Sequence, residues 1–240
     1  MQPTDKTEAM VCSLSIFFPC YNEEGSIRLV YESANRIIKQ IGIDHEIIFI
    51  DDGSTDNTLK ILKEIASDDE KVKIVSHASN LGYGAALQSG FRSATKTHIF
   101  FTDSDLQFDL NELPPLLPLI QHFDVVSCFR IKRYEGSLRK FNSCCWTGLM
   151  RLLFTIKMKD INCAFKLFRR EVIDGMKLSS TGALICTEIL ARAHRRGFRI
   201  HQVGVHHFPR KTGQPTGANP YVILKAFREL ILLYLNIRRG

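Results

Sequence analysis

Short apolar runs alternate with amphipathic segments through the first half of this chain. The runs include "VCSLSIFF", "HEIIFI", "KVKIVSH" and "THIFFTD", and the segments between them place apolar residues at helical spacing, as in "EEGSIRLVYESANRIIKQI". One more helix and strand are expected in "ELPPLLPLIQ" and "FDVVSCFR". Nearly continuous apolar strands alternating with helices are typical of a parallel sheet covered on both faces. We therefore predict an α/β fold with a mostly parallel central sheet.

The chain has 240 residues and contains no internal repeat, low-complexity segment or Pro/Gly-rich linker, which predicts a single domain, residues 1–240. Its charge is divided unevenly. Residues 1–129 have a formal net charge of −9 and residues 130–240 one of +16, within an overall +7. An acidic half can hold cations, and a basic half can hold phosphates or anionic lipid. The charge alone leaves open that both halves are simply solvated faces.

Several classes of protein are disfavoured. No apolar run reaches 18 residues, and the first ten residues do not resemble a secretory signal. The seven cysteines are scattered without a CxxC pair, which favours buried thiols in a reducing cytosol over disulfides or a zinc site. The cations could serve nucleic acid, but no recognition motif or aromatic ladder accompanies them, so we expect no nucleic-acid partner.

Polar motifs follow the predicted strands at the edge of the sheet where ligands of such folds bind. "DDGSTDNT" places two acids, Asp51 and Asp52, before a tight turn, and one of them could accept a hydrogen bond from a base or a ribose. "TDSDLQ" contains Asp103 and Asp105, which can converge on one hard cation. Mg²⁺ or Mn²⁺ would complete its shell with water and substrate diphosphate oxygens.

The segment "NLGYGAAL" superficially suggests a dinucleotide-binding turn, because Gly82 and Gly84 open a predicted helix. The third glycine of that fingerprint is missing, and the segment follows the third strand rather than the first. A Rossmann dehydrogenase is therefore disfavoured.

The motifs "FPCYNEE", "DDGSTDNT", "NLGYGAAL" and "DSDLQFD", in this order and spacing, resemble glycosyltransferase family 2, which has the GT-A fold. Further along, "CFRIKRYEGSLRKFN" and "DINCAFKLFRR" resemble the polyprenyl-phosphate sugar transferases of the dolichol-phosphate mannose synthase type. The resemblance extends over roughly residues 13 to 215, nearly the whole chain. It implies that 1–129 is the nucleotide- and metal-binding half and that 130–240 is the acceptor-binding half.

The resemblance implies roles for individual residues. Nucleotide-sugar binding is expected of Pro19, Tyr21, Glu23, Asp52, Asp103 and Gln107. Metal and diphosphate binding is expected of Asp103, Asp105 and Gln107. Acceptor binding is expected of Arg130, Arg139, Asp160, Arg210 and Lys211, and catalysis is expected to depend on Asp105, Arg130 and Arg210. In one departure from the eukaryotic mannose synthases, "GQPT" places Thr216 where they have a phosphate-binding Lys, a role that Lys211 could fill.

The resemblance implies metal-dependent, inverting transfer of a hexose from a GDP- or UDP-sugar to a polyprenyl or dolichyl phosphate. A phosphate monoester is already an oxyanion near neutral pH, so it needs no general base. Transfer to a glycan or glycolipid hydroxyl is the alternative, and it would need a base, for which Glu188 is the candidate. We favour the other interpretation of Glu188, that it caps or salt-bridges the predicted helix "EILARAHRRG". A nucleotide-sugar-binding scaffold without turnover is the remaining alternative.

The segment "LRKFNSCCWTGLMRLLFTIKMK" is predicted to be an amphipathic helix edged by cations, with Trp146, Leu149, Leu152, Leu153 and Phe154 on its apolar face. That face could lie on a membrane or could pack on the core. Many relatives carry C-terminal transmembrane helices that are not found after "NIRRG". We therefore expect a peripheral protein on the cytoplasmic face of a membrane, with a separate membrane-anchoring protein as a further partner. His206 and His207 are expected to point one inward and one outward.

Overall fold

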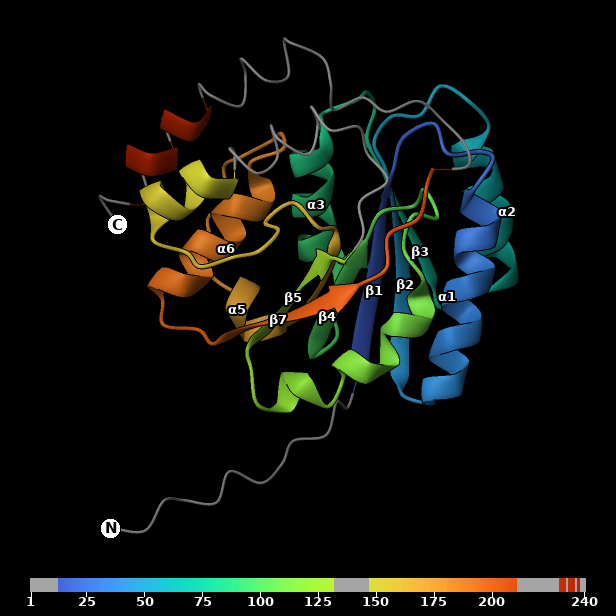
Figure 1. Cartoon of the computed structure of the whole chain (residues 1–240). Helices are drawn as coiled ribbons and strands as arrows, with labels where there is room; N and C mark the ends of the chain where they lie inside the picture. The colour runs from blue at the N-terminus through green and yellow to red at the C-terminus, as the bar shows by residue number, and fades with distance from the viewer. Residues whose placement is uncertain (1–12, 132–146, 211–228, 232, 236, 238–240) are drawn as a thin grey trace.

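A computed structural model describes residues 13–131, 147–210, 229–231, 233–235 and 237. Its centre is a seven-stranded sheet in the order β3-β2-β1-β4-β6-β5-β7 (Figure 1). The strands are β1 Ser13–Cys20, β2 Asp44–Asp51, β3 Val72–Ser76, β4 His98–Thr102, β5 Val125–Arg130, β6 Phe165–Arg169 and β7 Ile200–Val205. The helices are α1 Ile27–Ile41, α2 Thr58–Asp68, α3 Tyr83–Ser93, α5 Arg170–Ile173 and α6 Ile185–Arg195.

The sheet is mostly parallel, as the apolar runs predict. β1 pairs in parallel with β2 and β4, β2 pairs in parallel with β3, and β5 pairs in parallel with β7. The exception is β6, which lies antiparallel between β4 and β5. Because β1, β2 and β4 run side by side in one direction, the loops that follow them meet at one edge of the sheet.

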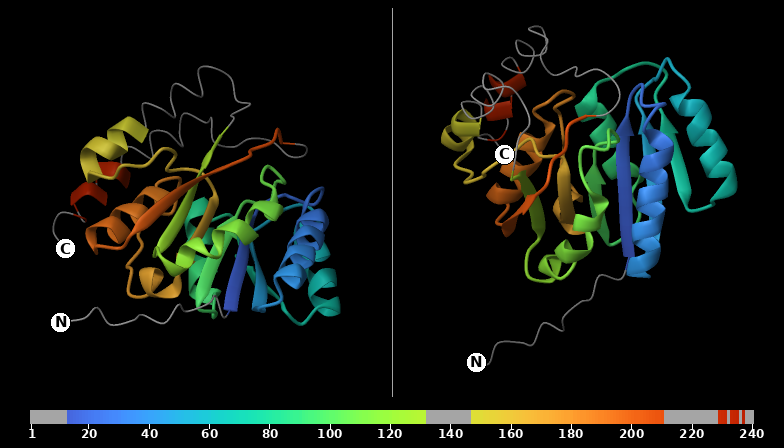
Figure 2. Two further views of the ribbon diagram at one scale, coloured as in Figure 1. Left: turned by 60° about the horizontal axis from the view of Figure 1, so that its bottom comes forward. Right: turned by 45° about the vertical axis from the view of Figure 1, so that its right-hand side comes forward.

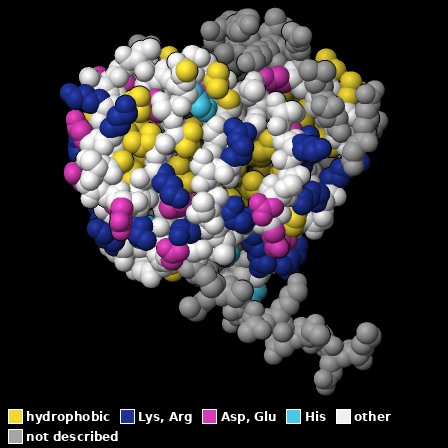
Figure 3. Space-filling model, turned by 180° about the vertical axis from the view of Figure 1, so that it is seen from behind, with side chains coloured by type: hydrophobic (Ala, Val, Ile, Leu, Met, Phe, Trp, Pro, Cys, Tyr) yellow, Lys and Arg dark blue, Asp and Glu magenta, His cyan; other side chains and the backbone are white. Residues whose placement is uncertain are grey.

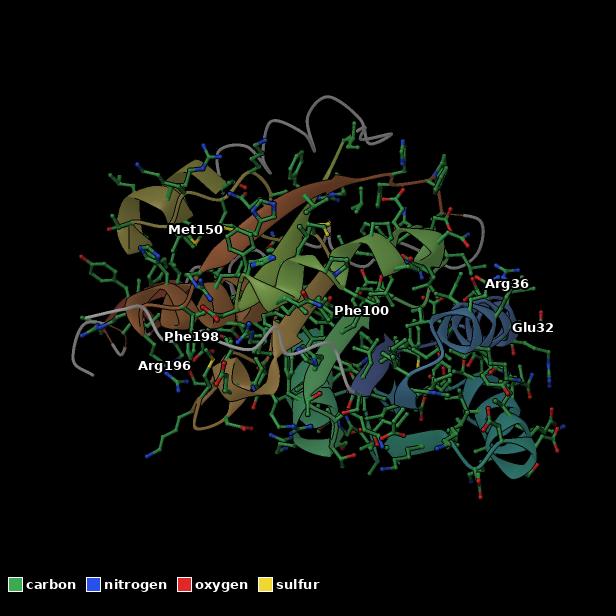
Figure 4. The ribbon with its side chains drawn as sticks, turned by 90° about the horizontal axis from the view of Figure 1, so that it is seen from below. Glu32, Arg36, Phe100, Met150, Arg196 and Phe198 are labelled. Carbon is green, nitrogen blue, oxygen red and sulfur yellow. The ribbon has the colours of Figure 1, made fainter. Side chains whose placement is uncertain are left out.

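Two apolar layers cover the sheet, one on each face (Figures 1 and 2). On the face covered by α3 and α6, Phe91 packs edge-on against the rings of Phe17, Phe101 and Phe168. On the face covered by α1, α2 and the 3₁₀ turns, Phe100 lies edge-on to Phe165. Figure 4 shows Phe100 within the sheet. The successive side chains of β4 thus serve opposite layers, the alternation that a buried strand requires.

The polar residues of the helices face outward where the helical period places them. In Figure 4, Glu32 and Arg36 project from α1 away from the sheet, while Arg196 lies against the ring of Phe198, 5.1 Å from its centre. Lys and Arg side chains are interspersed with Asp and Glu over the rear surface (Figure 3). Among the described residues on that face, the cations do not form one continuous basic patch.

The predicted helix in "ELPPLLPLIQ" is wrong. The structure has three short 3₁₀ turns instead, Leu110–Glu112, Pro114–Leu116 and Leu119–Gln121. Proline has no backbone N–H and its ring clashes with the preceding turn, so prolines at positions 114, 115 and 118 prevent a continuous helix. Three short turns still cover the sheet, because Leu110, Leu113, Leu116 and Ile120 are all buried.

The start of α2 is stabilised by a carboxylate that precedes the helix. The helix begins at Thr58 with Asn57 as its N-cap residue, and the Asn57 side chain makes no capping hydrogen bond. Asp56 Oδ1 accepts the Thr58 backbone N–H instead, at 2.9 Å. The carboxylate therefore stabilises the helix start from one position earlier than a standard N-cap.

Residues 147–154 are helical, and so are residues 229–231 and 233–235. The two segments lie side by side in Figures 1 and 2, and the rings of Phe154 and Tyr234 are 6.2 Å apart. Met150 and Phe154 are buried in the core, whereas Leu152 is 80% exposed. The helix therefore packs on the core with one side, and the apolar face predicted for it is divided between the core and the surface. Within the described residues, no helix is both long and apolar enough to span a membrane.

Candidate active site

The loop after β4 brings the two D-x-D carboxylates into a mostly buried position. Asp103 is half-buried and Asp105 is buried. The hydroxyl of Tyr83 donates to Asp103 Oδ1 at 3.0 Å, and the backbone N–H of Gln107 donates to Asp105 Oδ1 at 3.1 Å. Leu106 has a φ of +59°, a left-handed conformation that is costly for a branched side chain. Such strain commonly marks a functional loop.

The two carboxylates are electrostatically costly in this environment. Burial, followed by the neighbouring charge of Asp105, raises the pKa of Asp103 to about 7. Burial also raises the pKa of Asp105, although the Gln107 backbone N–H and the charge of Arg210 oppose that shift. Two neighbouring acids that resist ionisation, one half-buried and one buried, are a suitable place for a cation.

Arg210 reaches this site from the segment after β7. Its guanidinium is paired with Glu23 Oε1, and its Nη1 lies 3.9 Å from Asp105 Oδ2. Glu23 is buried, and burial raises its pKa while Arg210 lowers it. Ser26 donates to Glu23 Oε2 at 2.9 Å. The structure therefore brings together Glu23, Asp105 and Arg210, and the binding and catalytic roles expected of them stay predictions.

The segment that carries Arg210 is fixed along the D-x-D loop. The Phe208 backbone N–H donates to the Gln107 carbonyl at 2.8 Å, and the Gln107 side-chain amide donates to the Phe208 carbonyl at 3.0 Å. His206 Nδ1 lies 2.6 Å from Glu112 Oε1. Gln107 thus has a structural role beside the ligand role predicted for it, which stays a prediction. His206 is exposed and His207 is buried, so the expected inward and outward pair is confirmed.

Asp51 and Asp52 are both buried at the end of β2. The backbone N–H groups of Leu81 and Gly82 donate to the two oxygens of Asp52, each at 2.9 Å, and His77 Nδ1 lies 2.7 Å from Oδ1. Asp52 therefore holds the loop before α3. Its contact with a base or ribose stays a prediction, and in this conformation it would have to use the remaining acceptor capacity of Oδ2.

The loops after β1 and β2 hold each other. Asn22 has a φ of +56°, and its Oδ1 accepts the Thr55 backbone N–H at 2.8 Å. The Asn22 backbone N–H donates in return to the Ser54 hydroxyl at 3.0 Å. Tyr21, next in the chain, is 37% exposed, so its ring is available for a base. The carbonyl of Pro19 accepts the Ser104 hydroxyl at 2.8 Å, which ties β1 to the D-x-D loop.

Arg130 and Asp160, both predicted on the acceptor side, contact each other. Arg130 Nε and Nη2 donate to the two carboxylate oxygens of Asp160 at 2.7 and 3.2 Å. A bidentate pair of this kind fixes the guanidinium plane. Arg139 and Lys211 lie outside the described residues, as do Trp146 and Thr216.

Glu188 is completely buried in the first turn of α6. It accepts the backbone N–H groups of Ser179 and Ser180, at 3.0 and 2.8 Å from Oε2, and its Oε1 pairs with Arg192 at 2.9 Å. The sequence suggested either a general base or a cap or salt bridge of the helix for Glu188, and the salt bridge within the helix is confirmed.

Two further residues, Tyr83 and Lys166, are not singled out by the sequence motifs. Tyr83 contacts Asp103, and a tyrosine inside a glycine motif offers no signal of that contact. Lys166 is 1% exposed in the middle of the sheet, with its Nζ donating to the Ser127 hydroxyl at 2.8 Å. A lysine in an otherwise apolar strand is the signal that could have singled it out.

The residues present fit a hard divalent cation. Within the described residues, no group of three or more His, Cys, Asp or Glu is placed to hold a metal by itself. The site instead offers two neighbouring carboxylates, Asp103 and Asp105, and Mg²⁺ or Mn²⁺ characteristically takes its other ligands from water and substrate phosphates. The buried, mutually repelling acids described above are the observation that supports this fit.

The model of glycosyl transferase family 2 matches residues 15–176. Two undecaprenyl-phosphate 4-deoxy-4-formamido-L-arabinose transferases, from Pectobacterium carotovorum and Pectobacterium atrosepticum, are each 34% identical to this chain over 167 residues. The alignment covers 68% of this chain and 51% of each relative, so the chain spans about half the length of the curated relatives it matches.

Among solved structures, the chain is similar to glucosyl-3-phosphoglycerate synthase from Mycobacterium tuberculosis. The complex with Mn²⁺, UDP and phosphoglyceric acid superposes with a TM-score of 0.71, at 21% identity, over 94% of this chain and 78% of that one. The complex of the same enzyme with Mg²⁺ and UDP superposes with a TM-score of 0.69, over 94% of this chain and 79% of that one. At this identity the likeness shows the fold alone, and it agrees with the sheet described above. The chain has the GT-A fold and belongs to glycosyl transferase family 2.

Proposed function

We propose that this chain transfers a sugar, expected to be a hexose, from a UDP- or GDP-sugar to a polyprenyl or dolichyl phosphate, with the help of Mg²⁺ or Mn²⁺. The observation that carries the proposal is the convergence of Asp103, Asp105, Glu23 and Arg210 at the edge of the sheet. The Pectobacterium relatives, whose names specify undecaprenyl phosphate, support the acceptor class.

The residues of the site suit the leaving and attacking groups differently. A divalent cation held by Asp103 and Asp105 would neutralise the diphosphate that leaves. Arg210 lies beside Asp105 and can hold a phosphate oxygen, and Arg130 is fixed by Asp160 in one orientation. An acceptor phosphate oxygen would form the new bond to the anomeric carbon as the bond to the diphosphate breaks. A single displacement of this kind inverts the anomeric configuration.

A phosphate acceptor is favoured over a hydroxyl acceptor by the position of Glu188. A hydroxyl would need a general base within hydrogen-bond reach. Glu188 is completely buried and holds Ser179, Ser180 and Arg192, so it is engaged in structure. A phosphate monoester attacks without such a base.

The proposal is tested by incubating the protein with Mn²⁺ or Mg²⁺, a panel of UDP- and GDP-sugars that includes a formamido-arabinose donor, and a short polyprenyl phosphate. Mass spectrometry and the anomeric proton coupling would read out the product. We expect metal-dependent formation of a β-linked lipid-phosphate sugar from an α-linked donor. An α-linked product would contradict inversion, and turnover only on glycan or glycolipid hydroxyls would contradict the phosphate acceptor. Tight nucleotide-sugar binding with neither transfer nor metal-dependent donor hydrolysis would leave the scaffold alternative.

Glu188→Gln is expected to lower stability and to spare the chemistry. Replacing the carboxylate weakens its charged hydrogen bonds to Ser179 and Arg192 and should cost about 2 kcal/mol. The melting temperature should therefore fall, while kcat measured well below the new melting temperature stays within about threefold of wild type. A thousandfold loss of kcat at unchanged melting temperature would instead identify Glu188 as a base and shift the acceptor to a hydroxyl.

We also propose that the protein binds the membrane through the face formed by residues 147–154, 229–231 and 233–235, on the cytoplasmic side where nucleotide sugars are available. Leu152, Ile231 and Leu235 are 80%, 65% and 42% exposed on it. Residues 147–159 contain three exposed cations and no acid, which complements anionic lipid. A separate anchoring protein could add to this attachment.

Leu152→Glu should weaken binding to vesicles of anionic phospholipid at least tenfold, because a charge replaces a side chain whose burial contributes about 2 kcal/mol. Vesicle co-sedimentation at fixed salt measures the effect. Leu29→Glu is the matched control, since Leu29 is 54% exposed on α1, at the other end of the sheet (Figure 1). Equal losses in both variants, or none, would exclude this face as the docking surface.

A further inference from the structure

The turn "NLGYG", residues 80–84, has no part in the function proposed above, yet it connects two acidic elements of the site. On one side its backbone donates to Asp52, from the N–H groups of Leu81 and Gly82. On the other side the hydroxyl of Tyr83 donates to Asp103 Oδ1 at 3.0 Å. The turn therefore spans from the end of β2 to the D-x-D loop after β4.

The start of α3 is held in one position. The Gly84 backbone N–H donates to the Thr181 carbonyl at 2.9 Å. A Cβ atom on Gly84 would lie 2.5 Å from the Ser180 carbonyl oxygen, and one on Gly82 would lie 2.8 Å from the Thr181 carbonyl oxygen. The two glycines thus allow the backbone of residues 180–182 to close on the turn. Tyr83 lies between them, so its side chain leaves the backbone from a fixed point, and its hydroxyl reaches Asp103 from there.

The orientation of the Asp103 carboxylate depends on this hydroxyl more than the orientation of the Asp105 carboxylate depends on any one partner. Within the described part of the chain, Tyr83 is the side chain that hydrogen-bonds Asp103. Asp105 receives the Gln107 backbone N–H and also lies 3.9 Å from Arg210. Without the phenol, the Asp103 carboxylate would be able to rotate about its side-chain bonds.

We propose that Tyr83 is a positioning residue, whose hydroxyl orients the Asp103 carboxylate toward the divalent cation of the transfer reaction. This inference rests on the proposed function, because it assumes that Asp103 is a metal ligand. Ligating carboxylates are commonly oriented by hydrogen bonds from an outer shell, and loss of such a partner typically weakens metal binding ten- to a hundredfold. The glycine turn is then a rigid support for one metal ligand, built from residues far from it in sequence.

The test is direct titration of Mn²⁺ into the protein, followed by electron paramagnetic resonance, for wild type, Tyr83→Phe and Tyr31→Phe. Tyr31 is the matched control, since its hydroxyl donates to Asp69 Oδ2 at 2.9 Å and its loss removes an equivalent bond between α1 and the end of α2. We expect the Kd for Mn²⁺ to rise about tenfold or more in Tyr83→Phe and to stay unchanged in Tyr31→Phe. Both variants should melt within a few degrees of wild type.

A second readout separates positioning from a general structural defect. Raising Mn²⁺ should restore kcat of Tyr83→Phe, because the weakened step is metal binding. If wild type binds Mn²⁺ and Tyr83→Phe binds it equally well, the inference is overturned while the proposed function stands. Equal weakening in Tyr31→Phe would likewise overturn it, since the effect would then be structural. Failure of wild type to bind Mn²⁺, with or without nucleoside diphosphate, would overturn the metal dependence and this inference together.

Discussion

Asp105→Asn is expected to reduce metal-dependent transfer by about a thousandfold or more while leaving the protein folded. The amide keeps the shape of the side chain, and its oxygen can still accept the Gln107 backbone N–H. It removes the charge that would hold the cation, and metal stabilisation of a leaving oxygen amounts to several kcal/mol. Burial opposes ionisation of the Asp105 carboxyl group, so removing its negative charge should leave the thermal stability of the protein unchanged or higher.

Asp109→Asn provides the control for this variant. Asp109 is the third carboxylate of the same stretch, but it accepts the backbone N–H and the side-chain amide of Asn111 at the start of a 3₁₀ turn. It should lose little activity and about 1 kcal/mol of stability, as an N-cap does. Initial rates at several Mn²⁺ concentrations and thermal melts decide the matter. Comparable activity in Asp105→Asn and Asp109→Asn would exclude the D-x-D pair as the metal site.

Strands β1 to β5 were predictable because most of them are apolar runs buried on both faces of a parallel sheet. Strands β6 and β7 lie outside the predicted runs, and β7, with the sequence IHQVGV, is not an apolar run. The direction of β6 was not predictable in the same way. An antiparallel strand inserted between β4 and β5 has no local sequence signature when both of its faces are buried, as Phe165 on one face and Phe168 on the other show. The three prolines at 114, 115 and 118 were a readable signal against a continuous helix, and the expected helix failed on that ground.

The site was predictable as a set of motifs, and its internal contacts were not. Asp103 and Asp105 are recognisable because they follow the fourth predicted strand, after the "DDGS" motif, whereas the D-x-D spacing by itself is a weak signal. The pairing of Glu23 with Arg210 joins residues 187 positions apart, so only the fold brings them together. Likewise, the acidic pair in "DDGS" suggested a ligand contact. Asp52 also accepts hydrogen bonds from the backbone of Leu81 and Gly82, and the sequence around Asp52 gives no sign of these contacts.

Gly53→Ala is expected to be among the most destabilising single substitutions in the chain. Gly53 has a φ of +71°, where an L side chain costs about 1 kcal/mol, and a Cβ there would lie 2.4 Å from the backbone carbon of Ser79. Backbone cannot move aside as a flexible side chain can, so overpacking should add about 1–3 kcal/mol. The displaced loop would also disturb Asp52 next to it, so nucleotide binding should weaken together with stability.

Gly42→Ala isolates the backbone contribution, because Gly42 has the same φ of +71° at the end of α1, and a Cβ on it would have no atom within 4 Å. It should lose only the conformational cost, about 1 kcal/mol, and keep full nucleotide affinity. Chemical denaturation of both variants and nucleotide titration would measure the difference. Equal destabilisation would show that the loops after β2 and β3 can separate at little cost. The close packing of Gly53 on Ser79 would then not be what holds Asp52 and the "NLGYG" turn in place.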